Sequence, residues 1–203
     1  MNSESVLQMT SQMLVCRKII VLTGLPGAGK SVVGDVAREM GLPVISLGDV
    51  VREEVAKKGL EPTLDNILRV ANELRKALGK NAIAKLSINK IASACISNCI
   101  VVVDGVRSLD EIETIKESLL KDVIILAIHS SQKIRFERIL NRGREGDPKT
   151  FEEFRKRDFE ELSWGIGNVI ALADKMIVNE GRIEEFINEI RKFFSEALRN
   201  WCT

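Results

Sequence analysis

Ile19-Ile-Val-Leu-Thr-Gly-Leu-Pro-Gly-Ala-Gly-Lys-Ser31 is the stretch that decides the fold of this chain. An apolar, β-branched run leads directly into Gly24-x-x-x-x-Gly29-Lys30-Ser31, the pattern of a phosphate-binding loop. Its glycines let successive backbone N–H groups converge on phosphate oxygens, and the helix that follows adds its positive end. We expect Lys30 to reach the β- and γ-phosphates of a nucleoside triphosphate, and the Ser31 hydroxyl to hold Mg²⁺. The predicted ATP-binding residues of this segment are Gly24, Leu25, Pro26, Gly27, Ala28, Gly29, Lys30, Ser31 and Val32.

The composition excludes several classes of protein. The 203 residues are enough for one domain with a substantial core, which we expect over residues 17–203 after an N-terminal extension, residues 1–16. With 30 basic and 29 acidic side chains, the net charge is +1, so nothing indicates a general attraction to nucleic acid or to an anionic membrane. An anion site must therefore be local.

The cysteine spacing and the lengths of the apolar runs indicate in which cellular compartment the protein is expected. Cys16, Cys95, Cys99 and Cys202 show no paired C-x-x-C spacing, which disfavours a zinc site. No apolar run approaches the roughly 18 residues that cross a bilayer, and the N-terminus lacks the basic start and apolar centre of a signal peptide. We expect a cytoplasmic protein with reduced thiols.

Short β-branched runs alternate with longer stretches of helical period. This alternation predicts an α/β fold in which a five-stranded parallel sheet lies between two helix layers, with ligands beyond the carboxyl ends of the strands. Two intervals are longer than a simple crossover connection between parallel strands requires. They are residues 49–98, which are largely helical in pattern, and residues 134–164, which are rich in arginine. The strands are expected at Ile19–Thr23, Val44–Leu47, Ile100–Val103, Val123–Ile128 and Met176–Val178.

Charged residues follow the predicted second and third strands. Asp104 comes directly after Cys-Ile-Val-Val-Val, where a phosphate-binding-loop enzyme places an acidic Mg²⁺ ligand; alternatively, it is a turn former. Arg107 would face the same crevice, and Arg52 would approach it from the second strand. Two guanidinium groups can clamp a phosphate, although either arginine alone is commonly a surface residue.

The arginine-rich interval adds positive charge. Arg138 and Arg142 are four residues apart on a predicted helix and share one face, which would otherwise be an ordinary solvated basic surface. Phosphoryl transfer needs positive charge around the departing group, so we assign both to the ATP site. Arg157 could close over the same site as part of a lid at residues 141–157. The following Trp164-Gly-Ile-Gly-Asn168 has the sequence of a flexible bend with a packing anchor.

Together these motifs resemble the nucleoside monophosphate kinases, adenylate kinase above all, and more closely an archaeal family of adenylate-kinase-related proteins. Ile45-Ser-Leu-Gly-Asp49-Val-Val-Arg52 is similar to the motif whose arginine binds the acceptor phosphate, and Asp104-Gly-Val-Arg107 is similar to Asp-Gly-Phe-Pro-Arg. The Arg138/Arg142 spacing matches the pair that packs on adenine and touches the ATP phosphates. The resemblance implies ATP at the loop, the acceptor beneath a helical insertion at 49–98, and Mg²⁺ with ATP. The catalytic residues that it implies are Lys30, Arg107, Arg142 and Arg157.

The acceptor is the least determined part of the prediction. Glu111 stands where adenylate kinase has a base-reading glutamine, and an ionised glutamate only accepts hydrogen bonds. It would suit a guanine edge, or it lies on a solvated helix face. Leu47 replaces a threonine of that family, and the proline before Arg107 is absent. The acceptor-binding residues are expected to be Asp49, Arg52, Arg107 and Glu111, and the metal ligands Ser31 and Asp104.

A second resemblance competes with the first. Ala173-Asp-Lys-Met-Ile-Val-Asn-Glu-Gly181 is similar to the closing strand and loop of dephospho-coenzyme A kinase, which phosphorylates a ribose hydroxyl; there Asp49 would be the general base. Three functions follow. The first is transfer of the ATP γ-phosphate to a nucleoside monophosphate, AMP above all. The others are a dephospho-coenzyme A kinase and a non-catalytic, ATP-dependent switch.

Overall fold

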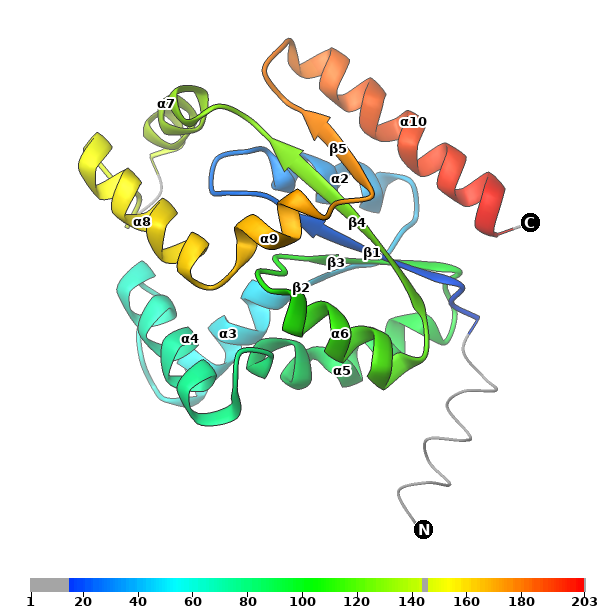
Figure 1. Cartoon of the computed structure of the whole chain (residues 1–203), viewed down its shortest axis with the longest axis horizontal. Helices are drawn as coiled ribbons and strands as arrows, with labels where there is room; N and C mark the ends of the chain where they lie inside the picture. Colours follow the sequence, from blue (N-terminus) through cyan, green and yellow to red (C-terminus); the bar gives the residue numbers. More distant parts are fainter. Residues whose placement is uncertain (1–14, 144–145, 203) are drawn as a thin grey trace.

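The computed structural model describes residues 15–143 and 146–202. They form a five-stranded parallel sheet in the order β2-β3-β1-β4-β5, with helices on both faces (Figure 1). This confirms the expected α/β fold. Residues 1–14 of the expected extension, and residues 144 and 145 of the expected lid, lie outside the described residues. The strands are β1 (Lys18–Thr23), β2 (Val44–Ser46), β3 (Ile100–Asp104), β4 (Asp122–His129) and β5 (Lys175–Val178).

The central strands are buried on both faces, which is why their sequences are continuously apolar. Successive side chains point to opposite faces, so Ile19 and Val21 enter one core while Ile20 and Leu22 enter the other. The first core is covered by α3, α4, α5, α6 and α9, and the second by α2 and α10 (Figure 1). The helices are α2 (Lys30–Glu39), α3 (Leu47–Lys57), α4 (Leu64–Leu78), α5 (Ala82–Cys95), α6 (Leu109–Leu119), α7 (Gln132–Arg142), α8 (Phe151–Ser163), α9 (Ile166–Ala171) and α10 (Ile183–Trp201).

Local signals fix where several helices begin. The Ser108 hydroxyl accepts the backbone N–H of Glu111 at the start of α6. Thr150 and Glu153 form a reciprocal capping box at the start of α8. Because α6 follows β3 directly, its first turn lies at the carboxyl edge of the sheet, where the residues of interest gather.

Two local expectations are wrong. Leu47 was expected to end the second strand, but it is the first residue of α3; it is apolar because that helix face enters the core. The segment from Trp164 to Asn168 is not a flexible bend throughout. Gly165 turns the chain with a φ of 105°, and α9 begins at Ile166. Trp164 itself caps the carboxyl end of α8.

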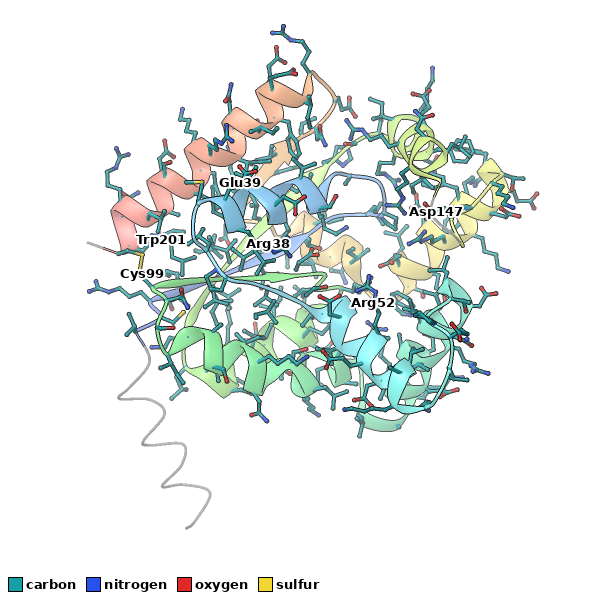
Figure 2. All side chains as sticks on the ribbon, turned by 180° about the vertical axis from the view of Figure 1, so that it is seen from behind. Arg38, Glu39, Arg52, Cys99, Asp147 and Trp201 are labelled. Atoms are coloured by element: carbon teal, nitrogen blue, oxygen red, sulfur yellow. A yellow bond between two sulfur atoms is a disulfide. The ribbon has the colours of Figure 1, made fainter. Side chains whose placement is uncertain are left out.

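The expectation of reduced thiols is also wrong. Cys99 and Cys202 form a disulfide that ties the end of the chain to the start of β3; Figure 2 shows this bond beside Cys99 and Trp201. The two cysteines are 103 residues apart, and only the return of α10 along the sheet brings them together. Cys16 and Cys95 are free and buried. Across the described residues, no helix combines the length and apolar character that crossing a membrane requires.

Candidate active site

The loop from Gly24 to Ser31 joins β1 to α2 at the carboxyl edge of the sheet. Its glycines are required because the chain packs closely around it. Gly27 has a φ of 83°, and a Cβ atom there would lie 2.7 Å from the carbonyl oxygen of Arg135 on α7. The Lys30 ammonium bends back and donates to the carbonyl oxygen of Gly24 at 2.5 Å. The loop is therefore already curled into a phosphate-sized cradle around its lysine.

Asp104 faces Lys30 across the ends of β3 and β1. Burial lowers the pKa of Lys30 while the Asp104 carboxylate acts to raise it. Burial likewise raises the pKa of Asp104, and the charge of Lys30 opposes that rise. The Asp104 Oδ1 atom is buried and has no hydrogen-bond partner among the described residues. An orphaned carboxylate oxygen at the edge of the sheet that carries Lys30 fits Mg²⁺, which takes oxygen ligands and usually arrives with substrate phosphates.

A cavity of about 350 Å³ opens on one side of the loop. Arg138 donates to the Ser130 hydroxyl at 3.0 Å and to Asn179 Oδ1 at 3.1 Å, and the Asn179 amide donates to the carbonyl oxygen of Ala28 at 2.9 Å. Arg138 and Arg142 thus face one cavity beside the loop, as expected from their spacing. The lining residues are Gly27, Gly29, Ser31, Val32, Arg138, Arg142, Asn179, Gly181 and Ile183.

A second cavity, about 160 Å³, lies against the Lys30 side of the loop. It brings together Lys30, Arg107, Arg142 and Arg157, which come from four different places in the sequence. Among its described lining residues, Glu161 is the one carboxylate. The sequence predicted these four cations as the catalytic set but did not identify Glu161.

Arg107 is held firmly at this cavity. Its Nε donates to Glu161 at 2.5 Å, and its backbone N–H donates to Glu111 at 2.7 Å. Burial lowers the pKa of Arg107, but the Glu161 carboxylate, together with Glu111 and Asp104, outweighs burial, and the pKa is raised. Burial would raise the pKa of Glu161, yet the ion pair with Arg107 holds it below the ordinary value. Both groups are therefore charged.

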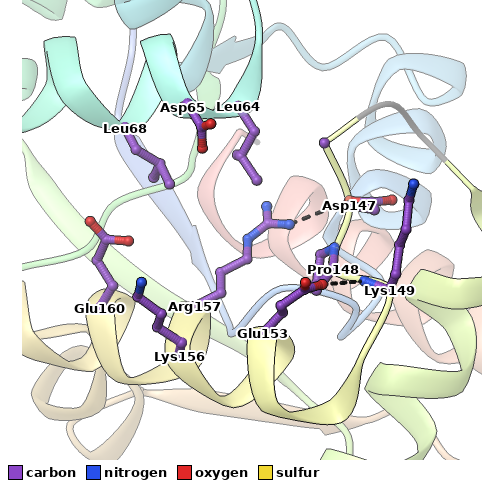
Figure 3. Close-up of a pocket in the computed structure, with 11 residues that line it drawn as sticks. Leu64, Asp65, Leu68, Asp147, Pro148, Lys149, Glu153, Lys156, Arg157 and Glu160 are labelled. Carbon is purple, nitrogen blue, oxygen red and sulfur yellow. Dashed lines mark hydrogen bonds and ion pairs between the residues drawn. The ribbon is translucent and has the colours of Figure 1, made fainter.

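The arginines expected in the lid share a carboxylate. Arg142 donates twice to Asp147, at 2.7 Å each, and Arg157 donates to the same residue at 3.3 Å. A cavity of about 530 Å³ lies between α4 and α8. Figure 3 shows Arg157 extending from α8 into this cavity, with its guanidinium directed at Asp147. That cavity is also lined by Leu64 and Leu68 of α4. Arg157 lines both this cavity and the one beside Lys30, so it connects the two.

The predicted acceptor residues are not all brought together. Asp49 and Arg52 are exposed and form an ion pair with each other on the first turns of α3. Glu111 is only 1% exposed; besides the Arg107 backbone, it faces Arg75 at 3.6 Å. Its carboxylate therefore supports the loop that carries Arg107, and none of the three cavities described above is lined by it.

A buried ion pair between α7 and α8 contacts the backbone of the loop at residues 24–31. Arg135 of α7 makes a two-bond pair with Asp158 of α8, at 2.8 and 2.6 Å, and also donates to the carbonyl oxygen of Pro26 at 3.0 Å. Its guanidinium lies 5.0 Å from the ring centre of Phe154. This pair connects the loop to both helices that carry the lid arginines.

Sequence reasoning missed several of these residues. Glu161 had a signal, since it follows Arg157 by four residues and so shares its helix face. Asn179 lay inside the segment similar to dephospho-coenzyme A kinase. Asp147, Arg135 and Asp158 had no specific signal, because their roles depend on how α7 and α8 pack.

Comparisons with known proteins agree with this fold. The sequence pattern of a family described as an AAA domain matches residues 23–155. The UPF0200 protein of Hyperthermus butylicus is 51% identical over 179 residues, which cover 88% of this chain and 94% of that protein.

Solved structures are more distant in sequence. TT1252 from Thermus thermophilus superposes with a TM-score of 0.63 at 18% identity, covering 89% of this chain and 98% of that one. A shikimate kinase from Bacteroides thetaiotaomicron gives a TM-score of 0.56, also at 18% identity, with the same coverage of each chain. At such identities the likeness shows the fold alone, which is that of a phosphate-binding-loop kinase.

Proposed function

The chain belongs to the archaeal UPF0200 family, and from the arrangement of its site we propose that it is an ATP-dependent nucleotide kinase with AMP as the acceptor. The observation that carries this proposal is the cavity of about 160 Å³ where Lys30, Arg107, Arg142 and Arg157 converge, which we call the transfer cavity. Few reactions need four cations in about 160 Å³. Transfer of a phosphoryl group between two phosphorylated molecules is one, because charge must be neutralised on donor, transferred group and acceptor together.

The donor would lie along the loop. Its adenine and ribose would occupy the cavity lined by Arg138 and Asn179, and its γ-phosphate would face Lys30. Mg²⁺, when bound with ATP, would neutralise charge on the β- and γ-phosphates, held through Ser31 and Asp104. The half-buried Lys30 ammonium stays close to the transferred group, and Arg142 and Arg157 approach it from the lid side.

The transfer itself needs no covalent intermediate. An oxygen of the AMP phosphate forms a bond to the γ-phosphorus in line with the bond that breaks, and the β-phosphate oxygen leaves with its electron pair as ADP. Arg107 would stabilise the acceptor phosphate. Before the acceptor binds, the anion that pairs with Arg107 is the Glu161 carboxylate. Arg52, exposed on α3, would complete the acceptor clamp after leaving Asp49.

One observation favours a second candidate, a kinase with a hydroxyl acceptor such as dephospho-coenzyme A. Such an acceptor needs a general base, and Glu161 is a carboxylate at the transfer cavity. Against this, both Glu161 oxygens face Arg107, and its pKa is held low, so it is a weak base.

The experiment is a direct comparison of acceptors. Purified protein with Mg²⁺ and ATP is offered AMP, GMP, CMP, UMP or dephospho-coenzyme A, and products are separated by chromatography. We expect ADP to form fastest with AMP. Phosphorylation of dephospho-coenzyme A alone would overturn the proposal in favour of the second candidate. Tight ATP binding without turnover of any acceptor would favour a nucleotide-dependent switch.

A substitution tests the placement of the acceptor. Arg107→Ala should raise the KM for the acceptor and leave ATP binding nearly unchanged. Arg182→Ala is the matched control, because Arg182 is exposed and pairs only with its helix neighbour Glu185 in the bonds described. An unchanged KM in Arg107→Ala would contradict the assignment of Arg107 to the acceptor.

A further inference from the structure

Trp164 is held by the insertion helix α4 at two points. Its indole Nε1 donates to Asn72 Oδ1 at 3.0 Å, and the guanidinium of Arg75 lies 4.5 Å from the ring centre. Asn72 and Arg75 are three residues apart on α4, so they share one face of the helix. A movement of α4 must therefore either carry the ring with it or break both contacts.

The same ring contacts Arg107. The guanidinium of Arg107 lies 5.5 Å from the ring centre of Trp164 while it binds Glu161. Attraction between a cation and the face of an indole is worth most where water is excluded, and Arg107 is mostly buried. One aromatic ring thus contacts an arginine of the insertion and an arginine of the transfer cavity.

A second path joins the same two arginines. Glu111 accepts the backbone N–H of Arg107 at 2.7 Å and faces Arg75 at 3.6 Å. Glu160, next to Glu161, accepts a hydrogen bond from Asn72 at 3.2 Å. The position of α4 is consequently linked to the backbone of Arg107 through Glu111, and to its side chain through Trp164.

This cluster is incompletely bonded. Arg75 Nη1 and Glu111 Oε1 are both buried and have no hydrogen-bond partner among the described residues. Unsatisfied buried polar atoms are unfavourable, so a small approach of Arg75 to Glu111 would be favourable if it made the missing bond. Such an approach would bring α4 closer to Glu111, and so closer to the backbone of Arg107 that Glu111 holds.

We propose that Trp164 is a positioning residue that couples the insertion helix α4 to the placement of Arg107. The proposal rests on the proposed function, in which the acceptor binds beneath the insertion. An acceptor that draws α4 inward would tighten the Arg75–Glu111 contact, press the ring against Arg107 and fix that guanidinium for the transferred phosphoryl group. Trp164 touches no substrate in this account; it acts through Arg107.

Steady-state kinetics give the first test. Trp164→Ala should lower kcat by about 10- to 100-fold, the scale expected when a catalytic group is slightly misplaced, with the KM for ATP within about 2-fold of the parent. Trp164→Phe keeps a ring face and should recover most of the loss. Trp201→Phe, at the far end of α10, is the matched control and should leave kcat unchanged. An equal kcat in Trp164→Ala and the parent would overturn the proposal.

Hydrogen exchange in the free protein gives a test that needs no acceptor. Trp164→Ala should speed amide exchange in two separate segments, α4 and residues 105–111, while α10 stays protected. Arg75→Met, which leaves the ring in place, should produce the same pattern more weakly and replaces Trp164→Ala if that variant does not fold. Faster exchange confined to residues 162–171 would show a local packing role and overturn the coupling. If the parent turns over no nucleotide, the proposed function fails while the exchange pattern still decides the coupling.

Discussion

Asp158→Ala should strongly destabilise the protein. The change removes one half of an ion pair whose side chains are only 5% and 6% exposed, and it leaves the Arg135 guanidinium without its two carboxylate bonds. The remaining acceptors, the carbonyl oxygens of Pro26 and Ser130, satisfy Arg135 only in part. A buried charge without its counter-ion costs about 3–5 kcal/mol, and we expect the free energy of unfolding to fall by that amount.

The structure also predicts what reverses this loss. Replacing both partners by apolar residues, Arg135→Met with Asp158→Leu, removes the uncompensated charge and should be less damaging than Asp158→Ala alone. Because Arg135 also donates to the carbonyl oxygen of Pro26, the double replacement should in addition weaken ATP binding. The comparison separates the effect of buried charge from the effect of lost contacts.

Urea unfolding followed by circular dichroism measures the free energy of unfolding of the single and the double variant. Glu185→Ala is the control: it breaks an exposed pair with Arg182 and should change the free energy of unfolding by about 0.5 kcal/mol or less. A loss below about 1 kcal/mol in Asp158→Ala would refute the reasoning, because that is the size expected for an exposed pair.

Three further predictions follow from individual contacts. Lys30→Met should slow phosphoryl transfer by at least about 100-fold in a single-turnover assay, whereas Lys175→Met on β5 should not. The pKa of Glu161 is held below its ordinary value of 4.5 by Arg107, so the stabilisation from that pair is present above about pH 4.5 and is lost as the pH falls further. The stability difference between the parent and Glu161→Gln should therefore be constant above about pH 5 and shrink as the pH falls below about 4.5, and a difference that stays constant there would contradict the prediction. Cys202→Ser opens a disulfide that spans 103 residues and should lower the free energy of unfolding by about 2–4 kcal/mol, with no added effect of a reductant.

The fold could be predicted from the sequence because its strands are buried on both faces. Such strands are short, continuous runs of β-branched residues, and they stand out against the longer helical periods between them. Leu47 was misplaced because an apolar residue after a strand looks the same whether the strand continues or a helix face enters the core. The disulfide could not be predicted, since nothing local relates Cys99 to Cys202.

The site was predictable to the extent that its residues belong to local motifs. Asp104 ends β3, and Lys30 and Ser31 begin the helix that a short loop joins to β1, so knowing the strands was sufficient to place them at one edge of the sheet. Arg75 and Trp164 lie in helices whose mutual packing decides their contacts, and the sequence carries no short-range pattern for that packing. The unpredicted residues are those that connect one helix to another.

The chain's own carboxylates neutralise the arginines around the transfer cavity. Arg107 pairs with Glu161, while Arg142 and Arg157 share Asp147. A chain of net charge +1 has no general attraction to phosphates, so separating these pairs would add to the local positive charge that Lys30 already supplies. A polyphosphate offers several oxygens and can replace both carboxylates at once, whereas a small anion replaces only one. Because Asp147 precedes α8 and Glu161 lies within it, such an exchange would shift α8 if ATP and an acceptor bind as proposed, and ligand binding would then be linked to the position of that helix.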